Sequence, residues 1–249
     1  MRERRVAAVI GLLVAVVGWL AVNPNSYETE FVASDAASET DGVAEYAEPL
    51  GESAEEGPLA TAVLELIAVK GRAPKTGYDR SEQFYSSWPT VEGCNLRQRI
   101  LKRDFGETAV MSETDGCVVV AGSFVEPYTG QLMTFTERAE ISKGVQIDHV
   151  VALSDAWQKG AQNLAQADRY ALATDPLNLI AVQSKANQEK SDGDAATWLP
   201  ANKRFRCQYV ARQISVKYKY TLWVTSAEKE AMLTVLANCP NERAVGVEI

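Results

Sequence analysis

The amino-acid sequence predicts a mixed α+β domain, because two kinds of periodicity alternate along the chain. Apolar residues recur at helical spacing in residues 58–70 and again in residues 205–218. A valine-rich run over residues 117–125 is followed by turn-forming residues and by a second β-prone run over residues 132–136, which predicts a β-hairpin. Residues 58–240 are enough for one domain with a sizeable core, and the chain has no internal repeat.

The other elements are predicted from the same patterns and from signals at helix ends. Gly71 and Gly106 can end the first two helices, and Thr225 with Glu228 has the pattern of a capping box that opens the last helix. Tyr128 is interpreted as a residue of the hairpin turn. We expect helices at residues 58–70, 95–105, 154–173, 184–189, 205–218 and 226–238, and β-rich runs at residues 117–125, 132–136, 145–153 and 177–182.

The first 57 residues are expected to lie outside this domain. Residues 1–5 are basic and residues 6–22 form an uncharged apolar run, a pattern of export signals that is also at the short limit for a membrane span. We predict a signal peptide or signal anchor over residues 1–23. The protein is then secreted, or attached through residues 6–22 to the outer face of the cytoplasmic membrane. Residues 24–57 hold ten acidic residues and no basic ones, which predicts a disordered linker.

This division changes the meaning of the net charge of −8. Residues 1–23 carry a net charge of +2 and residues 24–57 carry −10, so residues 58–249 are close to neutral. The acidic total therefore does not exclude a polyanionic substrate. We expect the folded domain over residues 58–240 and a C-terminal tail over residues 241–249.

The four cysteines indicate disulfide bonds. None of them stands in C-x-x-C spacing, which disfavours a zinc ribbon or a thioredoxin-type site. An even number of cysteines in an exported protein favours disulfides, and of the three possible pairings we favour the two local ones, Cys94–Cys117 and Cys207–Cys239. Four buried free thiols are the alternative.

The candidate active site centres on His149, the only histidine of the chain. Hydrolysis of a phosphodiester needs a base, a hard cation and a group that orients the base. His149 can be the base, Asp148 and Asn187 can offer oxygen ligands to a cation, and Asn178 can hold the loop or the imidazole. Because successive residues of a strand point to opposite faces, Asp148 and His149 can converge only if the strand ends or twists there.

These residues resemble the HNH, or ββα-metal, endonuclease motif, in which a two-stranded hairpin and one helix surround a single divalent ion. The resemblance implies that Asp148 and Asn187 are metal ligands, that His149 is the general base, and that Asn178 positions it. More specifically, the chain is similar over roughly residues 60–239 to exported bacterial HNH proteins related to the nuclease domain of GmrSD-type modification-dependent restriction enzymes. The matching motifs are Gly77-Tyr78-Asp79-Arg80, Cys94-Asn95-Leu96-Arg97, Pro127-Tyr128-Thr129-Gly130, Ile147-Asp148-His149-Val150-Val151-Ala152-Leu153, Asp175-Pro176-Leu177-Asn178-Leu179, Asn187-Gln188-Glu189-Lys190 and Trp198-Leu199-Pro200.

Two departures from the common HNH pattern carry predictions of their own. Asn187 stands where a histidine is common, which favours Mg²⁺ or Mn²⁺ as the cofactor over Zn²⁺. The gap between His149 and Asn178 is long, which predicts a helical insertion inside the motif.

The resemblance implies a nucleic-acid substrate, with DNA favoured and RNA as the alternative. Lys190 is a candidate contact to the scissile phosphate, and Arg97 and Arg103 are candidate contacts to the nucleic-acid backbone. The competing interpretation is that all three are solvated cations on helix surfaces. No obligate protein partner is evident from the sequence.

Two other functions compete with the nuclease. A catalytically inactive envelope or binding module on the HNH scaffold is favoured by the near-neutral domain, since nucleic-acid binders usually carry a positive stripe. Metal binding at Asp148 and Asn187 would separate it from an active nuclease. A Ser-His-Asp esterase is disfavoured because the chain has no G-x-S-x-G motif.

Overall fold

The computed structural model describes residues 57–247, and these residues form helices and small antiparallel sheets. The predicted α+β class is therefore confirmed, as are the disulfides Cys94–Cys117 and Cys207–Cys239. The predicted signal segment, with its apolar run at 6–22, and all but the last residue of the acidic linker lie outside the described residues. Within the described part, no helix is both long and apolar enough to cross a bilayer.

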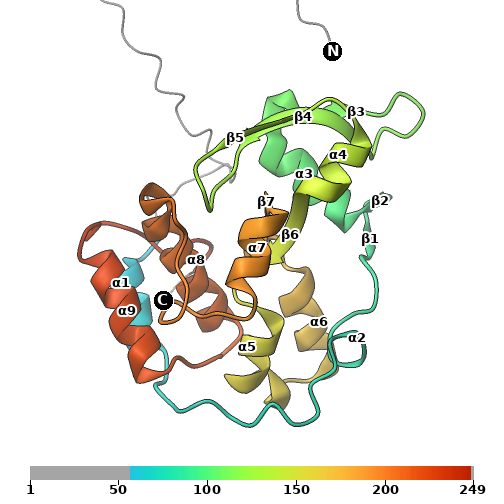
Figure 1. Ribbon diagram of the computed structural model, residues 1–249. Helices are drawn as coiled ribbons and strands as arrows, with labels where there is room; N and C mark the ends of the chain where they lie inside the picture. The colour runs from blue at the N-terminus through green and yellow to red at the C-terminus, as the bar shows by residue number, and fades with distance from the viewer. Residues whose placement is uncertain (1–56, 248–249) are drawn as a thin grey trace, which may run out of the picture. The chain divides into compact units, whose positions relative to one another are not determined.

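The strands form three separate antiparallel sheets, drawn in Figure 1. The predicted hairpin is confirmed and forms two strands of the largest sheet. The sheets are β1 (Thr90–Val91) with β2 (Cys94–Asn95), then β3 (Val110–Met111) with β4 (Val119–Val125) and β5 (Leu132–Phe135), and finally β6 (Val145–His149) with β7 (Leu179–Gln183).

The β6–β7 pair lies between two parts of the core (Figure 1). Its register runs from Val145 opposite Gln183 to His149 opposite Leu179. Because side chains alternate along a strand, Leu179 and Ala181 of β7 enter one hydrophobic cluster, whereas Ile180 and Val182 enter the other. Burial on both faces explains why this strand is a continuous apolar run in the sequence.

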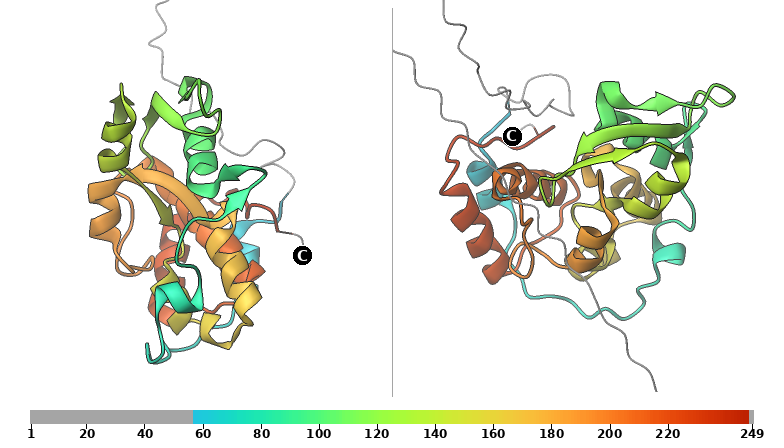
Figure 2. Two further views of the ribbon diagram at one scale, coloured as in Figure 1. Left: turned by 90° about the vertical axis from the view of Figure 1, so that its right-hand side faces the viewer. Right: turned by 45° about the horizontal axis from the view of Figure 1, so that its top comes forward.

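The helices fall into groups around this strand pair. One group consists of α1, α8 and α9, which pack together and against the face of the strand pair that carries Ile180 and Val182. In the right-hand view of Figure 2, the cyan and red helices of this group lie apart from the green α3. The helices are α1 (Ala60–Leu66), α2 (Arg80–Gln83), α3 (Leu96–Phe105), α4 (Arg138–Gly144), α5 (Leu153–Gln158), α6 (Gln166–Thr174), α7 (Ser184–Lys190), α8 (Arg206–Lys219) and α9 (Ser226–Leu236), with 3₁₀ turns η1 (Gly106–Thr108), η2 (Ala161–Asn163), η3 (Pro176–Asn178) and η4 (Lys203–Phe205).

The structure corrects two of the expected helices and confirms the predicted capping box at Thr225. The helix expected over residues 154–173 is broken into α5, η2 and α6, because the chain turns at Gly160. Gly160 has a φ of 126°, a backbone conformation that glycine adopts readily and other residues rarely adopt. The helix expected over residues 58–70 ends early, because the backbone from Ala68 to Lys70 hydrogen-bonds with Val224 instead.

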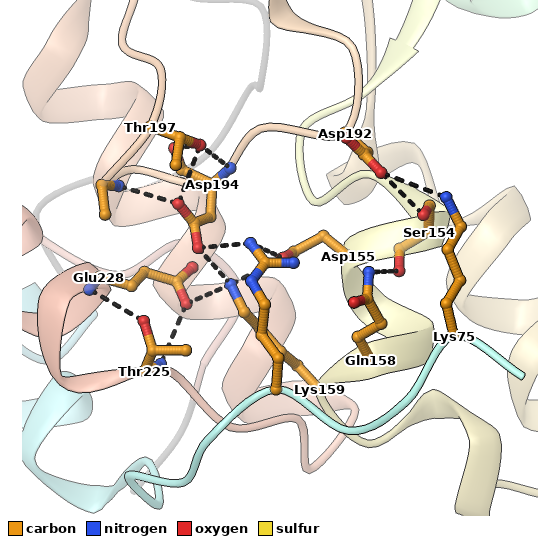
Figure 3. Close-up of polar contacts among 12 residues, drawn as sticks. Lys75, Ser154, Asp155, Gln158, Lys159, Asp192, Asp194, Thr197, Thr225 and Glu228 are labelled. Atoms are coloured by element: carbon orange, nitrogen blue, oxygen red, sulfur yellow. Dashed lines mark hydrogen bonds and ion pairs between the residues drawn. The ribbon is translucent and has the colours of Figure 1, made fainter.

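A buried network of charges ties these parts together (Figure 3). Lys159, which directly follows α5, lies 2.7 Å from carboxylate oxygens of both Asp155 and Asp194, and 2.6 Å from one of Glu228 on α9. Lys217 on α8 pairs with Asp155 and Glu228, and Arg72 with Asp155 and Asp194. The three cations balance the three carboxylates, so the buried network is neutral.

The C-terminal segment is part of the packed domain as far as it is described. The backbone of Ala60 donates to Glu242, and that of Ala244 donates to Pro58. Ala244 and Val247 are buried in the cluster that contains α1, α8 and α9. The tail expected over residues 241–249 therefore covers the core up to residue 247.

Candidate active site

The topology brings the four motif residues onto one β-β-helix unit. β6 ends at His149, β7 pairs with it in antiparallel register, and α7 follows β7 directly. Asn178 is the last residue of η3, immediately before β7, and Asn187 lies in the middle of α7. Helices α5 and α6 form the insertion between the two strands, as the long spacing predicts.

His149 is held in one orientation by a backbone group. Its Nε2 lies 2.9 Å from the carbonyl oxygen of Ala173 at the end of α6. A carbonyl oxygen can only accept, so Nε2 carries the hydrogen and the lone pair of the neutral ring is on Nδ1. Within residues 57–247, Nδ1 makes no hydrogen bond and is not a buried unpaired atom. This nitrogen is therefore the one that can accept a proton.

The surroundings keep the imidazole neutral. Burial, together with the positive charges of Arg80 and Lys190, lowers the pKa of His149 from 6.5 to about 3, while the hydrogen bond to Ala173 acts in the opposite direction. The guanidinium of Arg80 lies over the aromatic ring of Tyr85, 5.6 Å from its centroid, and donates a 3.3 Å hydrogen bond to the Tyr85 hydroxyl.

Two aromatic side chains from the segment between α2 and β1 pack beside the imidazole. The indole of Trp88 stacks on it at 6.2 Å between centroids, with 6° between the planes, and Tyr85 lies at 6.2 Å with a tilt of 42°. Sequence reasoning missed both residues. The dipeptide Trp88-Pro89 marks an irregular segment, but nothing local shows that this segment folds back to the end of β6.

The side chain of Asp148 has different partners from that of His149, the residue at which β6 ends. Its carboxylate accepts a 2.5 Å hydrogen bond from the hydroxyl of Tyr128 and lies 3.0 and 3.1 Å from Nζ of Lys190. Tyr128 is fully buried, and burial raises its pKa well above 10. Its side chain therefore does more than form a hairpin turn, which is all that the sequence indicates.

Lys190 connects the two residues. Its fully buried ammonium group contacts the Asp148 carboxylate and donates a 2.9 Å hydrogen bond to the backbone carbonyl of His149. The interpretation of Lys190 as a solvated lysine on the surface of α7 is therefore wrong. The side chains of Asp148 and His149 share no contact in the structure, and Lys190 bridges the two residues.

Asn178 holds the chain immediately after His149. It is fully buried, its Oδ1 accepts a 2.8 Å hydrogen bond from the backbone of Val151, and its Nδ2 donates to the carbonyls of Val151 and Leu172. Of the two roles that the sequence leaves open, the structure shows the contact to the loop and not the contact to the imidazole.

The turn that carries Asn178 is clamped by two arginines. Arg103 on α3 donates to the carbonyls of Pro176 and Leu179, and it pairs with its neighbour Asp104 at 2.6 Å. Arg212 on α8 is buried and donates to the same two carbonyls. Arg103 is thus occupied by internal contacts, and Arg212, which sequence reasoning missed, shares its role.

The donor set suits a hard divalent cation. Asp148 and Asn187 offer carboxylate and amide oxygens, the ligand types that Mg²⁺ and Mn²⁺ accept. The Nδ2 of Asn187 donates to Gln146 at 2.8 Å, which leaves its Oδ1 as an acceptor. Oδ1 of Asp148 contacts only Lys190 within the described residues, so it retains a lone pair. Among residues 57–247, the one cluster of carboxyl and cysteine groups compatible with a metal is Cys207 with Cys239 and Glu242, and both of its sulfurs are in a disulfide.

Comparison with known proteins places the chain in a family. Residues 96–235, more than half of the chain and all four motif residues, match the family described as GmrSD restriction endonucleases, C-terminal domain. A protein of the fungus Arthroderma benhamiae, named an uncharacterized secreted protein, is 37% identical over 184 residues, which cover 72% of this chain and 84% of the relative. The likeness thus extends beyond the bacterial proteins that the sequence motifs suggested. No solved structure matches. The chain belongs to the family of GmrSD restriction endonuclease C-terminal domains.

Proposed function

We propose that this protein is an exported, metal-dependent endonuclease that hydrolyses phosphodiester bonds of DNA, with RNA as the alternative substrate. The observation that carries the proposal is the state of His149. Its Nε2 is bonded to a backbone carbonyl, its ring is neutral, and Nδ1 is left to accept a proton. A general base needs such a lone pair directed at the water, and it needs a pKa that rises towards the working pH when the substrate binds. Membership of a restriction endonuclease family supports the same reaction.

In this proposal, Nδ1 of His149 takes a proton from the water that attacks phosphorus. The hydrogen bond from Nε2 to Ala173 stabilises the ring as it becomes positively charged. A phosphate bound beside the ring raises the pKa of His149, because a negative charge favours the imidazolium form. Asn178 is a positioning residue, because it fixes the loop at Val151, two residues after the base.

The cofactor of the proposal is Mg²⁺ or Mn²⁺, held by Asp148 and Asn187. When bound, the ion supplies positive charge to the phosphate and to the leaving oxygen. Tyr128 and Lys190 orient the Asp148 carboxylate and leave it one lone pair for the ion. Lys190 adds a fixed positive charge beside the base, and its burial assigns it this orienting role rather than capture of free substrate.

Export is supported by two further observations. The two disulfides are typical of oxidising compartments outside the cytosol. The fungal relative is named a secreted protein. Attachment to a membrane through residues 6–22 is the alternative to release.

Plasmid nicking by the full-length protein, with its disulfides intact, tests the proposal. We expect nicking with Mg²⁺ or Mn²⁺, none with EDTA, and none by His149→Ala. Lys185→Ala is the matched control, because Lys185 lies on α7 with 82% of its side chain exposed and only a 4.0 Å ion pair to Glu189. Nicking by His149→Ala at the wild-type rate would show that the base is misassigned.

A non-catalytic binding module is the second candidate, and the Lys190–Asp148 ion pair favours it. The ammonium already neutralises the carboxylate that a metal needs. Calorimetric titration with Mn²⁺ separates the two functions. Absence of Mn²⁺ binding, together with no cleavage of either DNA or RNA, would support the inactive scaffold.

A further inference from the structure

A pocket of about 330 Å³ lies between α3 and α4, next to the candidate active site. Its polar lining comes mainly from Asn95, Arg97, Gln98, Arg138 and Ser142. None of the described residues that line it is acidic. The pocket is at the lower end of the size range of small-molecule sites, large enough for a phosphate group with part of a nucleotide.

Arg97 reaches this pocket with part of its guanidinium unpaired. Its Nη2 donates a 2.9 Å hydrogen bond to the backbone carbonyl of Val145. Its Nη1 is buried and has no hydrogen-bond partner. A buried donor without a partner is costly, and a guanidinium group is well suited to bind an oxyanion that comes within its reach.

A second arginine adds to the positive charge of the pocket. Arg138, the first residue of α4, also lines it, and among residues 57–247 it makes no ion pair or side-chain hydrogen bond. Burial and the charge of Arg138 both lower the pKa of Arg97, and no carboxylate opposes them. Two like charges at one pocket disfavour each other, so an anion placed between them is stabilised by both.

Trp88 connects this pocket to the proposed base. The half-buried indole lines the pocket, and the same ring stacks on the imidazole of His149. The pocket and the base are therefore separated by a single aromatic side chain. A flat, partly exposed indole beside a cationic pocket suits a nucleic-acid strand, since bases stack on aromatic rings while arginines contact phosphates.

We propose that the pocket lined by Arg97, Arg138 and Trp88 is a subsite for a backbone phosphate that neighbours the scissile one. The proposal rests on the proposed nuclease function. Arg97 and Arg138 bind the non-bridging phosphate oxygens, and Trp88 supports the adjacent nucleotide and separates it from His149. The occupant is a strand of nucleic acid, and the subsite positions this strand for cleavage at the neighbouring phosphate.

The test measures binding without cleavage. Full-length protein carrying His149→Ala is titrated against fluorescently labelled single-stranded DNA, and anisotropy gives Kd at several salt concentrations. Arg138→Gln should raise Kd about tenfold and reduce the slope of log K against log salt by about 0.7, the effect of losing one phosphate contact. Arg97→Gln should act in the same direction, and Arg138→Lys should retain part of the affinity.

Arg99→Gln is the matched control. Arg99 lies on the same helix, and its guanidinium pairs with Glu92 outside the pocket. Equal Kd and equal salt slopes for Arg138→Gln, Arg97→Gln and Arg99→Gln would overturn the subsite. Thermal unfolding of each variant checks the fold, and Arg138 is exposed, so its replacement leaves the core intact.

Two further arms separate the possible failures. If wild-type protein cuts no nucleic acid but Arg138 still governs DNA binding, the proposed nuclease function fails and the subsite stands. If cleavage holds while Arg138→Gln changes neither Kd nor KM, the subsite alone fails. Displacement of the DNA by an equal concentration of inorganic phosphate would show a site for free phosphate and overturn the assignment to a nucleic-acid strand.

Discussion

Replacing Lys159 by methionine tests whether the buried charges hold the domain together. The ammonium of Lys159 is fully buried and lies within 2.7 Å of oxygens from three carboxylates (Figure 3). Without it, three buried carboxylates face only Arg72 and Lys217, which leaves one uncompensated negative charge. Breaking a buried pair from one side costs about 3–5 kcal/mol, whereas a whole domain is stable by only about 5–15 kcal/mol.

The assay is equilibrium unfolding in urea, followed by tryptophan fluorescence with the disulfides intact. Lys75→Met is the matched control. Lys75 and its partner Asp192 are 3.4 Å apart and about half exposed, at 51% and 48%, so their ion pair should contribute less than about 1 kcal/mol. A loss in Lys159→Met no larger than that in Lys75→Met would refute the reasoning.

A compensating change separates lost charge from lost packing. In Lys159→Met with Glu228→Gln, the remaining Arg72 and Lys217 balance Asp155 and Asp194. We expect this double variant to recover part of the stability that Lys159→Met loses, because replacing both partners removes the unpaired charge. A double variant as unstable as the sum of the two single changes would mean that the charge balance has no part in the effect.

Three further results are expected. Burial raises the pKa of Asp194, but its hydrogen bond and charge pairing with Lys159 and the charge of Arg72 lower it to about 2, below the ordinary 3.8. The resulting stabilisation, about 2 kcal/mol, is present above pH 4 and is lost as the pH falls towards 2. Urea unfolding at several pH values should show that the free energy of unfolding depends less on pH in Asp194→Asn than in the wild type. Asn178→Ala removes three hydrogen bonds at the loop, so it should lower stability by about 2–3 kcal/mol and slow plasmid nicking, whereas full activity would contradict its positioning role. Removing the Cys207–Cys239 disulfide by replacing both cysteines with serine should cost about 3–4 kcal/mol in the chain-entropy account, and an unchanged urea midpoint would contradict it.

Much of the fold could be predicted from local pattern. The hairpin of β4 and β5, the strand β7 and the capping box at Thr225 follow from spacing and turn chemistry. The run expected over residues 145–153 is a strand only as far as His149, and the favoured local cysteine pairing is confirmed. The predictions were wrong where tertiary contacts override propensity. The helix-like residues 154–173 break at Gly160, and the first helix ends early because its continuation pairs with Val224.

The candidate site was only partly predictable. His149, Asn178 and Asn187 are identified by their order along the chain, because each belongs to a motif of a few residues. Trp88 and Tyr128 come from segments 61 and 20 residues before the two motif residues that they contact, so no local pattern indicates them. Arg103 and Lys190 are of residue types that usually lie on the protein surface, yet both donate hydrogen bonds to backbone carbonyls inside the domain.

The sequence by itself determined the α+β class and the position of the single histidine, because these depend on residues close together in the chain or on a count. It favoured the local cysteine pairing, which the structure then confirmed. Only the tertiary structure decided which charges pair, which nitrogen of His149 carries the hydrogen, and that Arg97 keeps a buried donor unpaired. The physical reason is distance. A hydrogen bond or ion pair acts over about 3–4 Å, and residues far apart in sequence come within that range only when the whole chain has folded.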